Sequence, residues 1–305
     1  MKQIQLGSSS LHVSNIALGC MRMNELSIDD AEKVFRAALE AGVNFFDHAD
    51  IYGGGDSEDI FARAAGMNDD LREKVILQSK AGIRGNSFDF SKSHILKTVD
   101  ESLKRLQTDY LDVLLLHRPD ALMEPEEVAE AFDSLQASGK VRHFGVSNQH
   151  PMQVELLKQH VKQDLIANQL QFGLMHSLMI DQGLNVNMKN DAAVMREGGL
   201  LEYSQLNNMT VQAWSPFQYG MMEGVFVGND KFPEVNKKLS ELAGRYHITE
   251  SAAAAAWILR HPARIQTIVG TMNPERLAGI AEASEITLTR EEWYDLYQTA
   301  GNELP

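Results

Sequence analysis

Short apolar runs alternate with longer amphipathic stretches along most of the chain. In the amphipathic stretches, apolar residues recur at helical spacing, as in residues 28–41, after which Gly42 ends the predicted helix, and in residues 93–106. The eight apolar runs are residues 16–19, 44–47, 75–80, 111–117, 143–148, 167–172, 211–215 and 267–271. This alternation predicts an α/β fold in which each helical stretch connects two parallel strands.

The number and spacing of these runs favour one closed barrel. Eight parallel strands with eight connections in about 250 residues match a (β/α)8 barrel, whereas a doubly wound sheet usually has fewer strands. Two extended segments, 3–6 and 11–13, precede the first strand and predict a short β-hairpin. No Pro-rich or Gly/Ser-rich linker divides the chain. The sequence therefore predicts an α/β protein, a (β/α)8 TIM barrel with an N-terminal β-hairpin, in which residues 1–305 form one domain.

The composition limits the kinds of partner that we expect the chain to bind. The 42 acidic and 28 basic residues give a net charge of -14, which argues against nucleic acid and anionic membranes as partners. Cys20 is the only cysteine, so no disulfide forms within the chain, and the N-terminus lacks the apolar core of a secretory signal. The alanine-rich stretch 252–259 is too short to span a bilayer. We expect a cytoplasmic protein that acts on small molecules.

Three ionisable side chains each end an apolar run. Asp47, Lys80 and His117 are separated by 33 and 37 residues, or one β/α unit each. In a barrel they would meet at the C-terminal rim, where barrel enzymes place their chemistry. Tyr52 follows Asp47 by five positions, beside three glycines that allow the backbone to turn sharply. The sequence thus predicts a phenol, an acid, an amine and an imidazole at one site.

These four groups suit the reduction of a carbonyl. A phenol has a pKa of about 10, and the ammonium of Lys80 would lower the pKa of Tyr52 towards a value useful for proton donation. Asp47 would pair with Lys80, and His117 would donate a hydrogen bond to a substrate oxygen that gains charge. The hydride that the four residues lack must come from a bound cofactor.

Other kinds of site fit less well. His48, Asp50 and His117 could contribute metal ligands, but the chain has no HxxxH or HxH pair and no cysteine cluster, so we expect no metal site. Gly53 and Gly55 begin a GxGxxG pattern that fails at its third glycine, where Glu58 stands. The glycines are better interpreted as a rim loop than as a phosphate-binding loop.

The sequence resembles the aldo-keto reductase family over nearly its whole length, most closely predicted bacterial oxidoreductases that carry HADIYGG and HRPD together. The motifs that carry the resemblance are DHADIYGG (47–54), QSKAG (78–82), DVLLLHRPD (112–120), GKVRHFGVSN (139–148), NQ (168–169), AWSPF (213–217) and GTMNPERL (270–277). By that resemblance Tyr52 is the proton donor, Lys80 and Asp47 tune it, and His117 orients the carbonyl.

The resemblance also implies NADPH as cofactor. Ser147, Asn148 and Gln169 match positions that bind the nicotinamide carboxamide. Trp214 matches a ring that stacks on the nicotinamide, where many members have Tyr. Residues 215–220 resemble a segment that folds over the pyrophosphate, and residues 270–272 with Arg276 resemble the adenosine phosphate site. The implied cofactor-binding residues are Gly19, Cys20, Met21, Asp47, Ser147, Asn148, Gln169, Trp214, Ser215, Pro216, Phe217, Gly220, Gly270, Thr271, Met272 and Arg276.

Two features depart from the family's pattern at the adenosine end. Many relatives have a Lys in the loop after the eighth strand, where this chain reads GTM (270–272). Gly279 and Ile280 stand where an acidic residue and an Asn often follow the arginine. Cys20 would lie near the cofactor, but we favour a packing role because no second cysteine could form a disulfide with it.

Three functions remain open at this point. The first is an NADPH-dependent reductase of small aldehydes or ketones. The second is a regulatory or sensor protein that binds NADP(H) and turns over slowly, and the third is a phosphate-handling barrel isomerase or lyase without a nicotinamide. Specificity would come from rim loops at 118–124, 173–199 and 218–231 and from the C-terminal tail. Their apolar side chains, Met175, Met179, Met221, Met222 and Phe226, could form an adaptable pocket.

Overall fold

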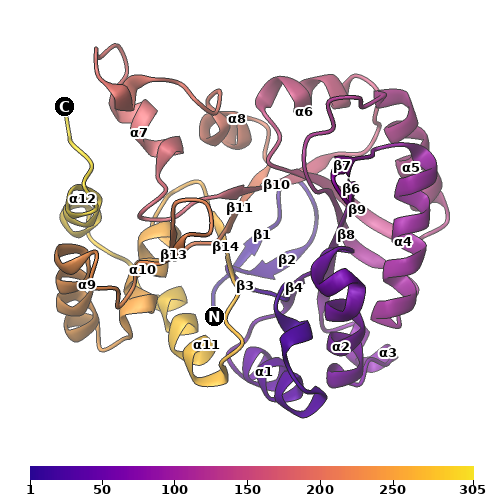
Figure 1. Cartoon of the computed structure of the whole chain (residues 1–305), viewed down its shortest axis with the longest axis horizontal. Coiled ribbons are helices and arrows are strands. Elements are labelled where there is room, and N and C mark those ends of the chain that lie inside the picture. The colour runs from indigo at the N-terminus through magenta and orange to yellow at the C-terminus, as the bar shows by residue number, and fades with distance from the viewer.

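The chain folds around a closed barrel of eight parallel strands (Figure 1). The computed structural model describes all 305 residues. The barrel strands are β3 (Ile16–Gly19), β4 (Phe45–Asp47), β5 (Ile76–Ala81), β8 (Leu111–Leu116), β9 (Val141–Ser147), β10 (Leu165–Gln171), β11 (Thr210–Trp214) and β14 (Gln266–Val269). β14 pairs in parallel with β3 and closes the barrel. The predicted (β/α)8 barrel is confirmed, and each predicted run lies within two residues of a strand at either end.

Helices between successive strands surround the barrel (Figure 1). Small polar side chains cap some of them: Ser27 accepts a hydrogen bond from the Asp30 N–H, and Ser91 accepts one from the His94 N–H. The connecting helices are α1 (Ile28–Glu40), α2 (Asp56–Ala65), α3 (Asp69–Arg72), α4 (Lys92–Leu106), α5 (Pro125–Ala137), α6 (Pro151–Lys158), α7 (Leu178–Leu184), α8 (Leu200–Leu206), α9 (Pro233–Tyr246) and α10 (Glu250–Leu259). α11 (Pro274–Ala281) and α12 (Arg290–Thr299) follow the last strand.

The N-terminal hairpin covers the end of the barrel opposite the rim. β1 (Gln3–Gln5) and β2 (His12–Ser14) pair antiparallel, as predicted. Leu6 and Val13 pack against the barrel-lining Phe45 and Ile166 in a small buried cluster. Gly7 has a φ of +56°, and a Cβ there would lie 2.2 Å from the backbone oxygen of Ile166. Only glycine fits this turn, because a side chain would collide with the Ile166 backbone. Gly7 therefore lets the hairpin pack directly against the N-terminal end of the barrel.

The C-terminal part of the chain after β14 is mostly helical, in α11 and α12. The Trp257 ring of α10 stacks on the Trp293 ring of α12 with centroids 4.9 Å apart. Each indole N–H donates to the other residue's backbone oxygen, at 3.0 and 2.9 Å. This pairing of two buried aromatic rings fixes α12 against the helical layer.

The rim loops contain short elements of their own. After β5 comes the hairpin β6 (Ile83–Arg84) and β7 (Ser87–Phe88), and after β11 comes β12 (Gln218–Tyr219) and β13 (Gly224–Val225). The prediction that apolar side chains of the rim loops form an adaptable pocket is wrong in part. Two of the five, Met179 and Phe226, pack in the main core instead. Met221 and Met222 are exposed. None of the helices combines the length and the hydropathy that a membrane-spanning helix requires.

Candidate active site at the C-terminal rim

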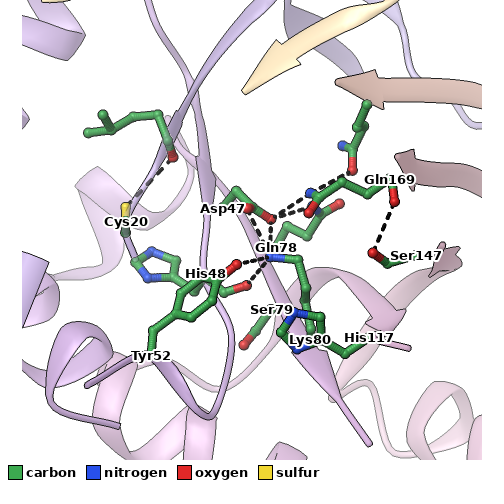
Figure 2. A network of polar contacts seen from close by, with 12 residues as sticks. Cys20, Asp47, His48, Tyr52, Gln78, Ser79, Lys80, His117, Ser147 and Gln169 are labelled. Carbon is green, nitrogen blue, oxygen red and sulfur yellow. Dashed lines mark hydrogen bonds and ion pairs between the residues drawn. The ribbon is translucent and has the colours of Figure 1, made fainter. Parts of the chain in front are cut away.

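Asp47, Lys80, His117 and Tyr52 converge at the C-terminal end of the barrel (Figure 2). Asp47 is the last residue of β4, Lys80 lies in neighbouring β5, and His117 follows the next strand, β8. Tyr52 begins a short 3-10 helix, η2 (Tyr52–Gly55), in the loop after β4. The glycines of η2 adopt left-handed φ values, +59° at Gly53, which lets the loop turn back over the barrel mouth. The sequence correctly predicted that these four residues meet.

Lys80 is the centre of the cluster. Its fully buried ammonium donates to a carboxylate oxygen of Asp47 at 2.8 Å, to the His48 backbone oxygen at 2.7 Å and to the Tyr52 hydroxyl at 3.1 Å. All three ammonium protons therefore have acceptors. Burial acts to lower the pKa of Lys80, but the negative charge of Asp47 and the hydrogen bonds to Asp47 and Tyr52 outweigh it and raise that pKa above its ordinary value. Lys80 is held as a cation beside the phenol.

The pKa of Tyr52 corrects the expectation from the sequence. Burial raises this pKa above its ordinary value of 10.0, and the opposing effect of Lys80 does not overcome it. Asp47 adds to the rise. The Tyr52 phenol thus stays protonated through the neutral range. Lys80 limits the rise instead of bringing the pKa down towards neutrality.

His117 is a neutral imidazole in this setting. Burial, followed by the positive charges of Lys80 and Arg118, lowers the pKa of His117 to about 2. Its ring lies edge-on to the Tyr52 ring with centroids 6.0 Å apart, and its Nδ1 is buried without a partner. A neutral imidazole has one N–H donor, so His117 can donate a hydrogen bond at neutral pH but does not supply an acidic proton.

A chain of buried glutamines supports Asp47, and the sequence analysis missed it. Gln78 and Gln169 donate to Asp47 Oδ1 at 2.6 and 3.0 Å, and both also donate to Gln212 Oε1, at 3.0 and 3.2 Å. Gln212 in turn donates to Gln266 Oε1 at 2.8 Å. The network fixes the carboxylate that holds Lys80. The signal in the sequence was a polar amide in or next to four apolar runs: Gln78, Gln169 and Gln212 lie inside their runs, and Gln266 directly precedes the last one.

The residues predicted to bind a carboxamide lie together beside this network. Ser147 Oγ donates to the Gln169 backbone oxygen at 3.0 Å, and Asn148 Nδ2 donates to Ser147 Oγ at 2.8 Å. Trp214 Nε1 donates to Asn148 Oδ1 at 3.1 Å. Asn148 and Ser215 have φ values of +57° and +49°, a conformation that costs free energy outside glycine and is concentrated at functional sites.

The phosphate end of the predicted cofactor site lies where β3 and β14 end. Arg276 is exposed in the first turn of α11, and Arg22, which the sequence analysis missed, donates to the Gly270 backbone oxygen. Asn273 caps α11 by accepting the Arg276 N–H at 2.7 Å, and Pro274 has no N–H. The helix start therefore offers fewer free N–H groups than expected, which leaves the two guanidinium groups as the main phosphate ligands available there.

The remaining predicted cofactor positions line the same rim. Cys20 follows β3 and is fully buried, and burial raises the pKa of its thiol well above the ordinary value, in keeping with packing. Met21 is exposed and Gly19 ends β3. The segment 215–220 leads from β11 into β12, where Gln171 Nε2 donates to the Gly220 oxygen at 2.8 Å. Pro216 is buried against Gly173, Phe217 is half-buried, and Thr271 and Met272 lie between β14 and α11.

Two further observations concern other kinds of site. No group of three or more His, Cys, Asp or Glu side chains is placed to hold a metal ion. His48 packs its ring edge-on against Phe61, 4.5 Å away, and burial lowers the pKa of His48 to about 3. A hollow of about 690 Å³ lies at the other end of the barrel, lined by Asn44, Arg72 and Tyr110 among others, away from the four converging residues.

Comparisons with known proteins agree with this geometry. The family model described as Aldo/keto reductase family matches residues 15–299. An oxidoreductase of Bacillus subtilis, YcsN, is 35% identical, with both chains covered completely. A 6-dehydroglucose reductase of Novosphingobium aromaticivorans is 35% identical over 99% of this chain and 96% of its own. The structure of an aldo-keto reductase from Klebsiella pneumoniae in complex with NADPH is 27% identical, has a TM-score of 0.76, and covers 99% of this chain and 96% of its own.

Proposed function

Because the chain belongs to the aldo/keto reductase family, it is an oxidoreductase, and we propose that it reduces aldehyde or ketone carbonyls with NADPH, using Tyr52 as proton donor. In this proposal residues 1–305 act as one domain around a single rim site. The observation that carries it is the contact of Lys80 with both Asp47 and Tyr52 beside a neutral His117. The NADPH complex of the Klebsiella pneumoniae relative supports the choice of cofactor.

The four residues divide the work on the carbonyl oxygen. The N–H of His117 donates a hydrogen bond to that oxygen and orients it towards the Tyr52 hydroxyl. Tyr52 gives its proton to the oxygen as the oxygen becomes a strong base. Lys80 donates to the phenol oxygen and stabilises the phenolate left behind, and Asp47 balances the charge of Lys80. Because its pKa is raised, Tyr52 keeps its proton until the carbonyl oxygen becomes basic enough to accept it.

The residues on the rim fit NADPH. The amide and hydroxyl groups of Ser147, Asn148 and Gln169 suit a carboxamide, and Trp214 offers an aromatic face beside them. Arg22 and Arg276 offer guanidinium groups for phosphate at the far end. When bound, NADPH supplies the hydride that the carbonyl carbon receives.

The presence of all four converging residues favours a catalytic role over a purely regulatory one. A protein that only sensed the cofactor would not need the Tyr52 hydroxyl within hydrogen-bond distance of Lys80 and edge-on to His117. The test is a titration of the purified protein with NADPH, followed by steady-state assays with a panel of aldehydes and ketones. Tight cofactor binding without turnover of any carbonyl compound would contradict the proposal in favour of a sensor. Absence of cofactor binding would favour a barrel isomerase or lyase.

A further inference from the structure

Arg118 follows His117 and extends over the mouth of the barrel. Its guanidinium carbon lies 5.5 Å from the centre of the Trp214 ring. Arg118 comes after β8 and Trp214 ends β11, and these strands are not neighbours, because β9 and β10 lie between them. The Arg118 and Trp214 side chains therefore meet across the ends of two strands, and Arg118 lies close enough to His117 and Tyr52 to affect their electrostatics.

Arg118 differs from every other shielded cation of the chain. Seven of the eight lysines and arginines that are buried or half-buried donate to a carboxylate or a backbone oxygen between 2.6 and 2.9 Å away. The eight are Arg72, Lys80, Lys92, Arg105, Arg118, Lys140, Lys238 and Arg260. Arg118 alone has no such partner. Asp120, the acidic residue next along the chain, instead accepts the backbone N–H groups of Phe90 and Leu122.

A shielded cation without an anion costs free energy unless a ligand completes it. Burial lowers the pKa of Arg118, and the neighbouring Tyr52 opposes that change. The chain as a whole carries a net charge of -14, so its long-range field repels anions. That field is screened beyond about 8 Å at physiological ionic strength, whereas Arg118 acts at contact. Trp214 gives the half-buried Arg118 an aromatic face but no negative charge, so the guanidinium can still receive an anionic group that arrives with the substrate.

We propose that Arg118 is a specificity-determining residue that binds an oxyanion on the substrate, so that the site prefers aldehydes and ketones carrying a carboxylate or phosphate near the carbonyl. A guanidinium can hold such a group with two parallel hydrogen bonds while His117 and Tyr52 hold the carbonyl oxygen. This inference rests on the proposed function, because it names the class of carbonyl compound that the same site reduces.

The test compares two substrates that differ mainly in charge. The value of kcat/KM for NADPH-dependent reduction is measured with 4-carboxybenzaldehyde and with its neutral methyl ester, methyl 4-formylbenzoate. The wild-type protein should prefer the carboxylate by at least about tenfold. The ratio of two substrates on one preparation does not depend on the fraction of active protein. Glyceraldehyde 3-phosphate against glyceraldehyde then distinguishes phosphate from carboxylate as the preferred oxyanion.

Variants assign the preference to Arg118. In Arg118→Met the ratio should fall to within about threefold of one, because the ligand for the oxyanion is gone. Arg118→Lys keeps the charge without the planar fork and should retain part of the preference, which keeps the test valid if the methionine variant does not fold. Arg84→Met is the control: Arg84 lies on the same rim, is exposed and pairs with Asp89 at 2.8 Å, so its loss should leave the ratio unchanged.

Three results would overturn the inference. The first is equal reduction of both benzaldehydes by the wild-type protein, and the second is a charge preference that survives in Arg118→Met. The third is a preference for neutral glyceraldehyde over 4-carboxybenzaldehyde and glyceraldehyde 3-phosphate, if this preference is lost in Arg118→Met. That result would show that Arg118 binds hydroxyl groups instead. In all three cases the protein still reduces carbonyls. Failure of the proposed function looks different, because then no compound would oxidise NADPH.

Discussion

Lys80 donates its third ammonium proton to the Tyr52 hydroxyl oxygen over 3.1 Å, after Asp47 and the His48 backbone oxygen have taken the other two. The hydrogen bond therefore leaves the phenol proton of Tyr52 free to point towards a substrate. It also means that Lys80 acts on the phenolate product of proton transfer more than on the resting phenol, whose pKa burial keeps high.

Tyr52→Phe should abolish carbonyl reduction while leaving cofactor affinity nearly unchanged. The ring still packs, but the transferable proton is lost, and general acid catalysis typically contributes about 10²- to 10⁴-fold. The measurements are kcat with the best aldehyde and the NADPH dissociation constant from fluorescence. A variant that kept most of its turnover would show that another group is the acid.

The pH profile of reduction should be flat between about pH 5 and 9. The pKa of His117 lies at about 2, so His117 is already neutral throughout this range, and the raised pKa of Tyr52 keeps its proton until the pH exceeds the ordinary phenol value. Lys80→Met removes the charge that opposes burial, so the basic limb should move to higher pH while kcat falls by about 100-fold or more. A basic limb that did not move in Lys80→Met would contradict the coupling between Lys80 and Tyr52.

The sequence predicted the four catalytic candidates better than it predicted their surroundings. Asp47, Lys80 and His117 could be placed because each lies within one residue of the end of a strand, and the ends of parallel strands meet at one rim. The direction of the Tyr52 pKa shift could not be predicted, since it depends on how deeply the folded chain buries the phenol. Gln212 was missed for a similar reason: a glutamine in a strand gives no sign of its partners, which come from strands distant in the sequence.

Gln212→Leu should lower kcat without removing any group that touches the substrate. Gln212 Oε1 accepts hydrogen bonds from both amides that hold Asp47, so its loss frees Gln78 and Gln169 to rotate and loosens the carboxylate under Lys80. A small misplacement of this kind can cost about tenfold to 100-fold in rate.

The matched variant for Gln212 is Gln266→Leu, one hydrogen bond further from Asp47, which should have a smaller effect. A positioning role also requires that the basic limb of the pH profile move in Gln212→Leu. Loss of thermal stability with an unaltered profile and an unaltered kcat would reduce Gln212 to a structural residue.

Asp50→Asn should stabilise the protein at pH 8 but not at pH 4. Burial, followed by the charge of Glu58, raises the pKa of Asp50 from 3.8 to about 7, and its Oδ1 is buried without a partner. Between pH 3.8 and about pH 7, Asp50 keeps a proton in the folded chain that it has lost in the unfolded chain, so the free energy of unfolding falls as the pH rises. Removing the charge should return roughly 1–3 kcal/mol at pH 8, allowing for partial exposure, or about 2–6 °C in Tm.

Asp89→Asn is the control of opposite sign for Asp50. The hydrogen bonds from Ser91 lower the pKa of Asp89 to about 2, so this carboxylate contributes stability above pH 3.8 that is lost as the pH falls towards 2. Asp89→Asn should therefore lower Tm at pH 8. Melting curves of both variants at pH 4 and pH 8 decide the matter, and an Asp50→Asn variant that is no more stable than wild type at pH 8 would mean that Asp50 is not destabilised by its charge.

Arg276→Ala should weaken NADPH binding selectively and leave NADH binding almost unchanged. NADPH differs from NADH by a 2′-phosphate, which a guanidinium can hold with charge-assisted hydrogen bonds worth about 1.5 to 3 kcal/mol each, so the wild-type preference should be at least about tenfold. The α11 cap consumes the Arg276 N–H and Pro274 has none, so the preference depends on side chains more than on the helix start. Arg22→Ala separates the two guanidiniums: Arg22 bonds to Gly270 between the two loops, and its loss should weaken both cofactors alike. Dissociation constants for NADPH and NADH in the three proteins test this, and equal wild-type affinities, or an Arg276→Ala variant that loses both cofactors equally, would show that Arg276 does not contact the 2′-phosphate.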